Sequence, residues 1–492
     1  MNDVATLRPS RPVTGADNII PLIVRGEIID GDLVEHVARG GELVFRTPDV
    51  SRYIDALVLK DPLALRDLYA LSLDDVIDYL GALAPLLDYR INPHVAKSLE
   101  LMLSANLFSR DMATAVFDVL PNILRRASIE EIIAENIGRD YLEGWVSHRM
   151  MDREVAVRAF GARSIHVIAG NSPMVALLTV LMNAITRGDA IIKIPSNDPY
   201  FSVALAQTMI EMAPGHPLTR HLSVAYWKGG DEKVERALYD PRNIEKIVAW
   251  GGFAGMRSIR QYLSPGLDLV ALDPKISGSI VGREAFASDE TIHDAARKAA
   301  ADIGYMNQGA CGNARTIFVE TGLDAAGIDK ANRFGKLVFE AIQALPPTLS
   351  SPHPAFDPVL RAEIDGIRYS DMFRVFGGKG AEGAVIVSQE DEEVDFSERL
   401  DCRVANVVPV ADIAEAMRHV TVHMQTIGIY PDSLKETLRD ECALRGGQRV
   451  VSLGRAIAAN WAGPHDAIEP LRRMVRWLRD DSLTHDSGII LP

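Results

Sequence analysis

The sequence predicts an α/β protein in which a doubly wound parallel sheet is followed by a second α/β domain. Three observations predict this fold class. The chain has 492 residues, more than one hydrophobic core can organise. From residue 160 onward, short β-branched runs alternate with helical patterns, as they do in βαβ units. Several of these runs end in turns rich in Gly, Asn and Pro, where parallel strands bind ligands.

Composition narrows the class of protein. The content of 47% hydrophobic and 24% charged residues is that of a globular protein, and the net charge of −15 argues against a nucleic-acid partner. The three cysteines (Cys311, Cys402 and Cys442) lack C-x-x-C spacing, which disfavours a disulfide framework or zinc site and favours a reducing compartment. The sequence opens without a secretory pattern, and its most apolar stretch, Met174 to Ile185, is too short to span a bilayer. We therefore expect a cytoplasmic protein.

The first 150 residues mix strand-like runs with amphipathic helical stretches and show no chemistry. An alternation of strand and helix follows. Strands are expected at 165–169, 190–194, 222–227 and 247–250, and helices at 173–185, 199–212, 233–239 and 255–262. Right-handed crossovers place the carboxyl ends of such strands at one edge of the sheet, so the turns at 170–173, 193–197 and 251–255 should share that edge.

A second strand and helix series begins near Ser277 and runs to about residue 454. Its helices are expected at 291–304, 331–344 and 411–420. The tail contains an amphipathic helical pattern at 468–478. We therefore expect an N-terminal region with a nucleotide-binding domain over 1–280, a cysteine domain over 281–454, and a returning segment over 455–492 that contributes to an oligomer contact.

The strongest chemical signal is the run Asn-Gln-Gly-Ala-Cys-Gly-Asn-Ala-Arg at 307–315. Small residues around Cys311 let a carbonyl approach the sulfur and leave backbone N–H groups for an oxyanion. A thiolate attacks an acyl or aldehyde carbon well and also leaves easily. The alternative is a buried structural cysteine, the usual state of a cysteine taken at random.

This run, with Arg315 four residues after Cys311, resembles the catalytic motif of the aldehyde dehydrogenase superfamily. The turn at 170–173 resembles its oxyanion turn, which implies that the Asn171 amide is a donor. The run at 188–196 resembles its adenosine-ribose strand, and residues 250–252 resemble its glycine turn near the pyrophosphate. The four motifs have the superfamily's order and nearly its spacing, which implies an aldehyde-dehydrogenase-like fold with the active site in a cleft between domains.

Within the superfamily, the sequence most resembles acyl-CoA reductases of the LuxC type, the fatty-acid reductases of bacterial luminescence systems. The resemblance includes residues 422–429 and the closing region 464–477. It implies that the protein binds NADPH, with NADH as the alternative, takes an acyl group from coenzyme A onto the cysteine and reduces it to an aldehyde. It also implies a homo-oligomer and an acyl-protein synthetase as partner. The implied site residues are Cys311 and Asn171 for catalysis and Lys193, Ser196, Asn197, Gly251 and Gly252 for the cofactor, with no metal.

Departures from the superfamily pattern sharpen these expectations. Ala271 stands where hydrolytic relatives carry the Glu that activates water, so a thiol is the expected acyl partner. Asp273 is an alternative base, although a strand-end turn explains it better. Asn197 stands where relatives that prefer NAD place a Glu, so a 2′-phosphate is not repelled and Lys193 can meet it.

Two positions stay open. The residue that replaces the superfamily's nicotinamide-ribose Glu is not identified; Asp401, Arg403 and Asn406 are candidates. His419 and His423 have a metal-binding spacing, but no third ligand accompanies them and a structural role is favoured. Two other functions compete with acyl-CoA reduction: a coenzyme A-independent aldehyde or semialdehyde dehydrogenase, and a non-reducing acyl carrier or acyltransferase-like subunit.

Overall fold

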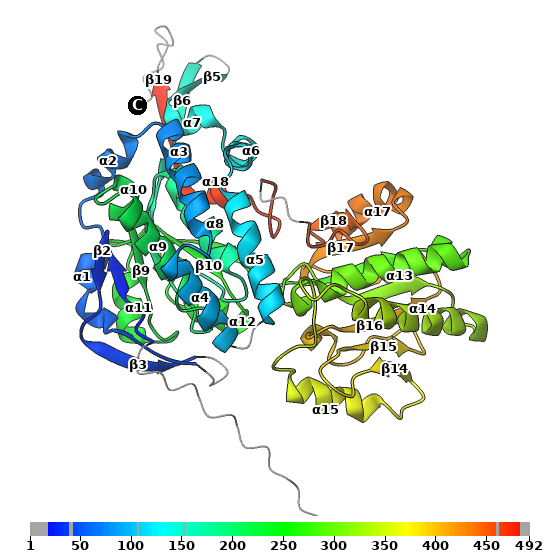
Figure 1. Ribbon diagram of the computed structural model, residues 1–492. Helices are drawn as coiled ribbons and strands as arrows, with labels where there is room; N and C mark the ends of the chain where they lie inside the picture. The colour runs from blue at the N-terminus through cyan, green and yellow to red at the C-terminus, as the bar shows by residue number, and fades with distance from the viewer. Residues whose placement is uncertain (1–17, 39–42, 106–107, 151–152, 459–461, 483–492) are drawn as a thin grey trace, which may run out of the picture. The chain divides into compact units, whose positions relative to one another are not determined.

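The computed structural model describes residues 18–38, 43–105, 108–150, 153–458 and 462–482. The chain divides into two compact units (Figure 1). Unit 1 comprises residues 1–105, 117–273 and 461–492, and unit 2 comprises residues 106–116 and 274–460. Within the described residues, no helix is long and apolar enough to cross a membrane.

Unit 1 is built on a seven-stranded sheet in the order β11-β10-β7-β8-β9-β1-β2. Its strands are β1 Leu22–Val24, β2 Glu27–Ile29, β7 Arg163–Val167, β8 Asp189–Lys193, β9 Leu222–Ala225, β10 Lys246–Trp250 and β11 Asp268–Leu272. The five strands from β11 to β9 are parallel, and β1 and β2 add an antiparallel edge. Strand order reverses at β7, because β8 lies on one side of it and β10 on the other. Such a switch point is where doubly wound sheets bind ligands.

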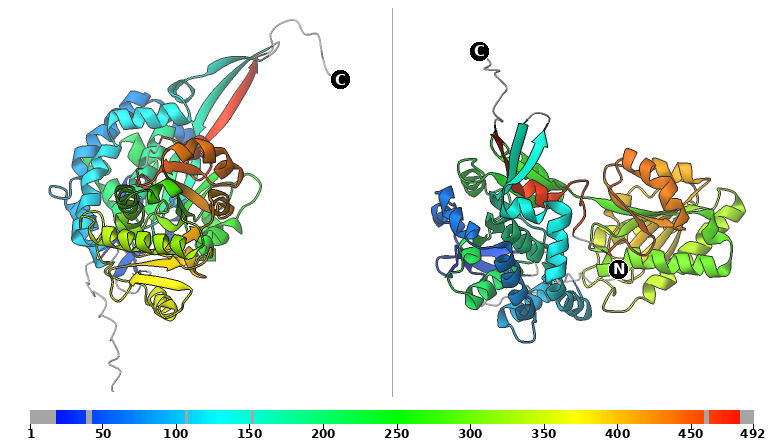
Figure 2. Two further views of the ribbon diagram at one scale, coloured as in Figure 1. Left: turned by 90° about the vertical axis from the view of Figure 1, so that its right-hand side faces the viewer. Right: turned by 90° about the horizontal axis from the view of Figure 1, so that it is seen from above.

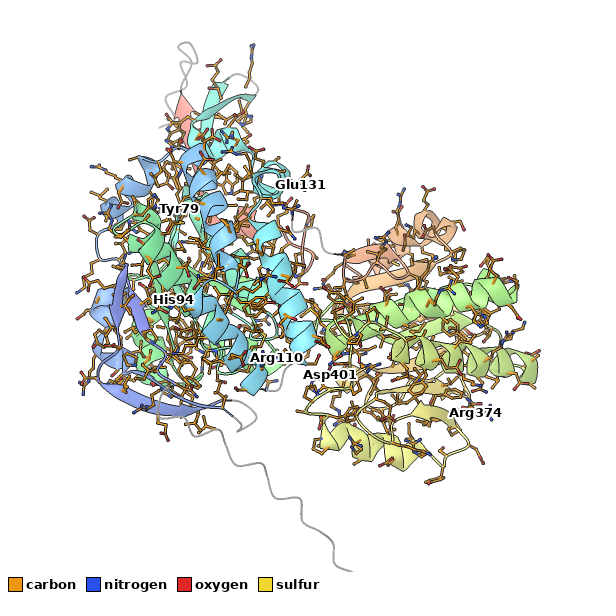
Figure 3. All side chains as sticks on the ribbon, viewed as in Figure 1. Tyr79, His94, Arg110, Glu131, Arg374 and Asp401 are labelled. Atoms are coloured by element: carbon orange, nitrogen blue, oxygen red, sulfur yellow. The ribbon has the colours of Figure 1, made fainter. Side chains whose placement is uncertain are left out.

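The helices of unit 1 cover both faces of this sheet. They include α1 Ile54–Leu57, α2 Arg66–Tyr69, α3 Leu73–Leu83, α4 Pro93–Ser104, α6 Arg126–Asn136, α7 Arg139–Glu143, α8 Pro173–Thr186, α9 Phe201–Met212, α10 Pro217–Arg220, α11 Glu232–Leu238 and α12 Phe253–Arg260. Helix α5 Arg110–Ile123 begins in unit 2 and ends in unit 1. The apolar pattern that predicts α8 reflects burial of almost every side chain of this helix. Tyr79 of α3 ties this helix to α9 through a hydrogen bond to the Met209 carbonyl, 3.1 Å (Figure 3).

Two smaller antiparallel sheets complete unit 1. One pairs β3 Leu33–Val37 with β4 Val44–Pro48, and the other has the order β19-β6-β5, with β5 Val146–Met150, β6 Arg153–Gly161 and β19 Val475–Ser482. The three-stranded sheet extends as a ribbon in which the C-terminal strand lies beside β6 (Figure 2).

The helix predicted at 468–478 is therefore wrong over most of its length. Only α18 Pro470–Met474 is helical, and the chain then becomes β19. Pairing with β6 gives this segment a partner for its backbone, and Trp477 packs edge-on against Tyr141 at 5.4 Å between ring centroids. Long-range contacts of this kind override a local helical pattern.

Unit 2 carries a second seven-stranded sheet in the order β14-β15-β16-β13-β12-β17-β18. Its strands are β12 Ile276–Val281, β13 Ala314–Glu320, β14 Phe373–Gly377, β15 Ala384–Ser388, β16 Val404–Val410, β17 Met424–Tyr430 and β18 Arg449–Ser452. All are parallel except β14. Its helices include α13 Asp289–Gly304, α14 Ala325–Gln343, α15 Pro358–Ile367, α16 Ile413–Arg418 and α17 Ser433–Leu444. Helices α13 and α14 pack together over the sheet and bury the largest apolar cluster of this unit (Figure 1).

Candidate active site

Cys311 lies in the connection between α13 and β13. Helix α13 starts at a capping box formed by Ser288 and Thr291, and its apolar face packs on the sheet. A 3₁₀ turn over Tyr305–Gln308 follows, and Cys311 comes just before β13 begins. The Cys311 thiol is exposed and outside any disulfide. In contrast, burial raises the pKa of Cys402 to about 12 and that of Cys442 to about 11, so these two thiols are poor nucleophiles.

The backbone before Cys311 is strained. Met306, Asn307 and Gln308 have φ values of 51°, 51° and 71°, in the left-handed region that residues other than glycine avoid. This conformation costs roughly 1–2 kcal/mol per residue, so the surroundings must enforce it. Hydrogen bonds of the Gln308 side chain help to hold this conformation. Its amide nitrogen donates to the carbonyls of Ala314 and Val404, and its amide oxygen accepts the Val404 N–H, all at 2.8–2.9 Å.

The turn that holds Cys311 is fixed from both sides. Asn313 accepts the N–H of Ala310 at 2.9 Å and donates to the carbonyl of Asp302 at 2.9 Å, which ties the turn to the end of α13. The Ser277 hydroxyl donates to the Cys311 carbonyl at 2.7 Å. Because the main chain is immobilised while the thiol is exposed, the sulfur is presented on a rigid support.

Two guanidinium groups interact electrostatically with Cys311. Burial lowers the pKa of Arg315, and Asp401 and Cys311 oppose that effect. The Nη1 atom of Arg315 has no hydrogen-bond partner within the described residues. Burial likewise lowers the pKa of Arg449, with Asp302 and Cys311 opposing it. Positive charge beside a cysteine is the setting in which thiolate nucleophiles occur.

In unit 1 the turn with Asn171 follows β7 at the switch point. Asn171 is exposed, and the next residue, Ser172, caps α8 by accepting the Met174 N–H at 3.3 Å. A Cβ on Gly170 would lie 2.1 Å from Oδ1 of Asn197, whose amide also donates to the Gly170 carbonyl at 3.2 Å. The glycine therefore lets the predicted oxyanion turn and the predicted ribose turn pack directly on each other.

Lys193 and Ser196 belong to the neighbouring turn after β8. The Lys193 ammonium lies 5.4 Å from the centre of the Trp227 ring. Desolvation lowers the pKa of Lys193 to about 8, and Glu235 partly opposes this shift. Ser196 interacts with Tyr226, whose pKa is raised by burial and moderated by a hydrogen bond from Ser196.

Gly251 and Gly252 follow β10, the strand on the other side of β7. A Cβ on Gly252 would meet nothing within 4 Å, and one on Gly251 only the Met256 sulfur at 3.9 Å. Neither has a positive φ. The protein's own packing therefore does not demand these glycines. They leave room beside the first turn of α12, where backbone N–H groups suit an anion.

Comparison with known proteins places the chain in a family. The model of the acyl-CoA reductase (LuxC) family matches residues 68–477. The chain belongs to this family. The long-chain acyl-protein thioester reductase of Photorhabdus laumondii is 27% identical over 368 residues, covering 73% of this chain and 72% of that protein. The reductase of the same name from Vibrio harveyi is 25% identical and covers 72% and 71%.

Solved structures confirm the predicted fold class. Lactaldehyde dehydrogenase from Escherichia coli superposes with a TM-score of 0.71 at 16% identity, covering 94% of this chain and 99% of that one. The NADP-dependent glyceraldehyde-3-phosphate dehydrogenase of Bacillus halodurans, complexed with NADP, gives the same TM-score at 13% identity, with 94% and 99% covered. This LuxC family chain thus has an aldehyde-dehydrogenase-like fold.

The remaining sequence candidates have clear surroundings. Asp273 pairs with Arg260 at 3.0 Å, which accounts for it without catalysis. Arg403 is buried and donates to the Ile342 carbonyl at 2.8 Å, and Asn406 is buried inside the sheet with its oxygen accepting the Val394 N–H at 3.0 Å.

Asp401 differs from these two candidates because it is exposed (Figure 3). Desolvation of its carboxylate by surrounding protein atoms nevertheless raises the pKa of Asp401. The Cys402 N–H and the Arg315 guanidinium lower that pKa in part. Of the three candidates, it alone has a side chain available to a ligand.

His419, one of the two histidines, makes contacts that account for it structurally. His419 bonds Glu393 at 3.1 Å and stacks on Phe318, and the described residues contain no cluster of three or more potential metal ligands.

Sequence reasoning missed three contributors in these surroundings: Arg449, Asp302 and Glu235. Arg449 and Glu235 are distant in sequence from the motifs they serve, whereas Asp302 is close to the cysteine motif and makes its contacts far along the chain. Asp302 accepts the N–H groups of Gly454 and Ala456 at 2.8 Å, and burial raises its pKa to about 6. Only the fold reveals such a contact, since no local pattern marks it.

Proposed function

We propose that this protein reduces an acyl thioester, most simply a fatty acyl-CoA, to the aldehyde through an acyl group carried on Cys311. The observation that carries the proposal is an exposed thiol on a rigid turn beside two guanidinium groups, in a chain that belongs to the acyl-CoA reductase family. In this proposal the Cys311 thiolate attacks the thioester carbon, the oxyanion accepts hydrogen bonds from the Asn171 amide and the Cys311 N–H, and coenzyme A leaves as its thiolate.

The proposed hydride donor is NADPH, with NADH as the alternative. The residues at the switch point of unit 1 suit such a dinucleotide, because Gly251 and Gly252 leave open space and Lys193 offers a cation. Asn197 brings no negative charge against a 2′-phosphate. When bound, the dinucleotide supplies the hydride. The chain's own residues hold the acyl carbon on sulfur and, with Ala271 in place of a general base, do not promote its hydrolysis.

An acyl-protein thioester is the second candidate donor, because the curated relatives carry that name. It would make an acyl-protein synthetase the partner that supplies the acyl group. We also retain the proposal of a homo-oligomer, with residues 455–492 contributing to the contact.

Acyl transfer from radiolabelled acyl-CoAs of graded chain length tests the function. Wild type should take up one acyl group per chain and oxidise NADPH, whereas Cys311→Ala should lose the label and lower turnover at least about 10³-fold. Cys442→Ala, which removes a buried thiol, should keep both activities. Label retained in Cys311→Ala would contradict the proposal. Oxidation of an aldehyde to a free acid without coenzyme A would favour the alternative of a coenzyme A-independent dehydrogenase. Acyl labelling of a protein that binds no NADPH would favour the alternative of an acyl carrier.

A further inference from the structure

A buried polar cluster lies beyond the ends of β8 and β9 in unit 1. Lys193 ends β8, Trp227 follows β9, and Glu235 reaches in from α11. Glu235 is only 3% exposed and Trp227 only 2%. Trp227 belongs to the apolar core of this unit, but that core does not explain Lys193 and Glu235, because buried charges are costly in such a place.

Polar atoms of this cluster lack partners within the described residues. Glu235 Oε1 accepts the N–H of Gly230 at 3.2 Å, but Oε2 has no hydrogen bond, and neither does the indole nitrogen of Trp227. The hydroxyl of Tyr239, whose ring centroid lies 5.3 Å from that of Tyr262, also has no hydrogen-bond partner within the described residues. A buried carboxylate oxygen without a donor is expensive and usually indicates a missing ligand or water.

Lys193 and Glu235 interact electrostatically. Glu235 is the charged group that opposes the lowering of the Lys193 pKa by burial, and its Oε1 atom accepts the N–H of Gly230. Burial raises the pKa of Tyr262, and an interaction between its hydroxyl and the Glu235 side chain raises that pKa further. A cation and a carboxylate thus interact at the edge of the sheet where the run at 193–197 turns.

Resting on the proposed function, we infer that Glu235 is a specificity residue that accepts a hydrogen bond from the adenosine ribose and sets the balance between NADH and NADPH. A ribose diol can donate to a carboxylate oxygen, whereas a 2′-phosphate cannot donate and is repelled by it. Lys193 acts in the opposite direction, because an ammonium attracts the phosphate. Asn197 leaves the ribose without the usual acid, and Glu235 provides one from a different element.

Steady-state kinetics with both dinucleotides test the inference. Glu235→Gln keeps an oxygen for the Gly230 N–H but removes the charge. We expect it to raise the ratio of kcat/KM for NADPH to that for NADH by about tenfold or more, through KM rather than kcat. The control is Glu232→Gln, which removes an exposed charge paired with Arg236 on the same helix and should leave the ratio unchanged. A ratio within twofold of wild type in a folded Glu235→Gln variant overturns the inference.

Binding of nucleotide fragments separates this inference from the function itself. In wild type, calorimetry should give weaker binding of 2′-deoxyadenosine 5′-monophosphate than of 5′-AMP, and Glu235→Gln should erase that difference and strengthen 2′,5′-ADP. If wild type oxidises neither dinucleotide with any acyl thioester, the proposed function fails while the fragment result still decides the role of Glu235. Equal binding of 5′-AMP and its 2′-deoxy form to wild type would overturn that role without any variant.

Discussion

At the scale of single residues, the ammonium of Lys193 has a protonation state that should be visible in kinetics. Desolvation lowers its pKa from 10.5 to about 8. Below pH 8 the ammonium is charged and attracts a 2′-phosphate, and above pH 8 the free enzyme loses that charge. We therefore expect kcat/KM for NADPH to fall as pH rises through about 8, while kcat/KM for NADH changes much less. A pH profile of both dinucleotides between pH 6 and 9.5 measures this.

Lys193→Met should flatten the NADPH profile and lower kcat/KM for NADPH by about tenfold or more at pH 7. Lys228→Met is the matched control, because Lys228 is an exposed lysine after β9. A descending limb near pH 8 that survives in Lys193→Met would assign the titration to another group and remove Lys193 from the phosphate site.

At the scale of elements, the turn around Cys311 depends on one buried glutamine. Gln308→Leu removes three buried hydrogen bonds, after which the Val404 N–H keeps only its 3.1 Å hydrogen bond to the Asp401 carbonyl. We expect it to lower the free energy of unfolding by about 3 kcal/mol. Denaturant unfolding measures the loss, and Gln261→Leu, at an exposed position directly after α12, should cost less than about 1 kcal/mol. Equal losses in the two variants would show that Gln308 does not hold the strained segment.

The elements also show what sequence can predict. Periodicity located β7, β8, β10 and the helix before Cys311, because these elements bury a regular apolar face. The glycine, asparagine and cysteine motifs were visible because each sits in one continuous run. Glu235 and Arg449 were not, since their relation to those runs arises only when separate strands and helices pack. The helix predicted at 468–478 is wrong for the same reason, because pairing with β6, rather than the local sequence pattern, determines that β19 is a strand.

At the scale of the whole molecule, the two sheets present their chemistry at opposite strand ends. In unit 1 the predicted cofactor residues follow the carboxyl ends of β7, β8 and β10. In unit 2 Cys311 precedes the amino end of β13, and its supports Ser277 and Val404 stand at the starts of β12 and β16. The predicted cofactor residues of the first sheet thus follow the rule that places ligands at carboxyl ends, and the position of Cys311 in the second sheet does not.

Unit 1 depends on a segment that is distant in sequence from the rest of this unit. The sequence of unit 1 is interrupted after residue 273 and resumes at 461. The second edge of β6 is therefore paired by a strand from the resumed part, β19. A chain shortened after Met474 would leave β6 paired with β5 alone and remove Val475, which is 2% exposed. We expect a loss of more than about 3 kcal/mol in the free energy of unfolding, from the lost valine burial and ladder bonds.

Limited proteolysis with mass spectrometry checks where this truncation acts. Cleavage should begin in the unit 1 peptides of residues 117–273, while peptides of residues 274–458 stay protected, because the pairing that is lost belongs to unit 1 alone. Leu478→Ser is the matched control, since Leu478 is 53% exposed on the same strand and should leave the cleavage pattern unchanged. Early cleavage throughout unit 2 would mean that β19 supports both units. If the shortened chain resisted proteolysis as well as wild type, β6 would not need a second partner strand.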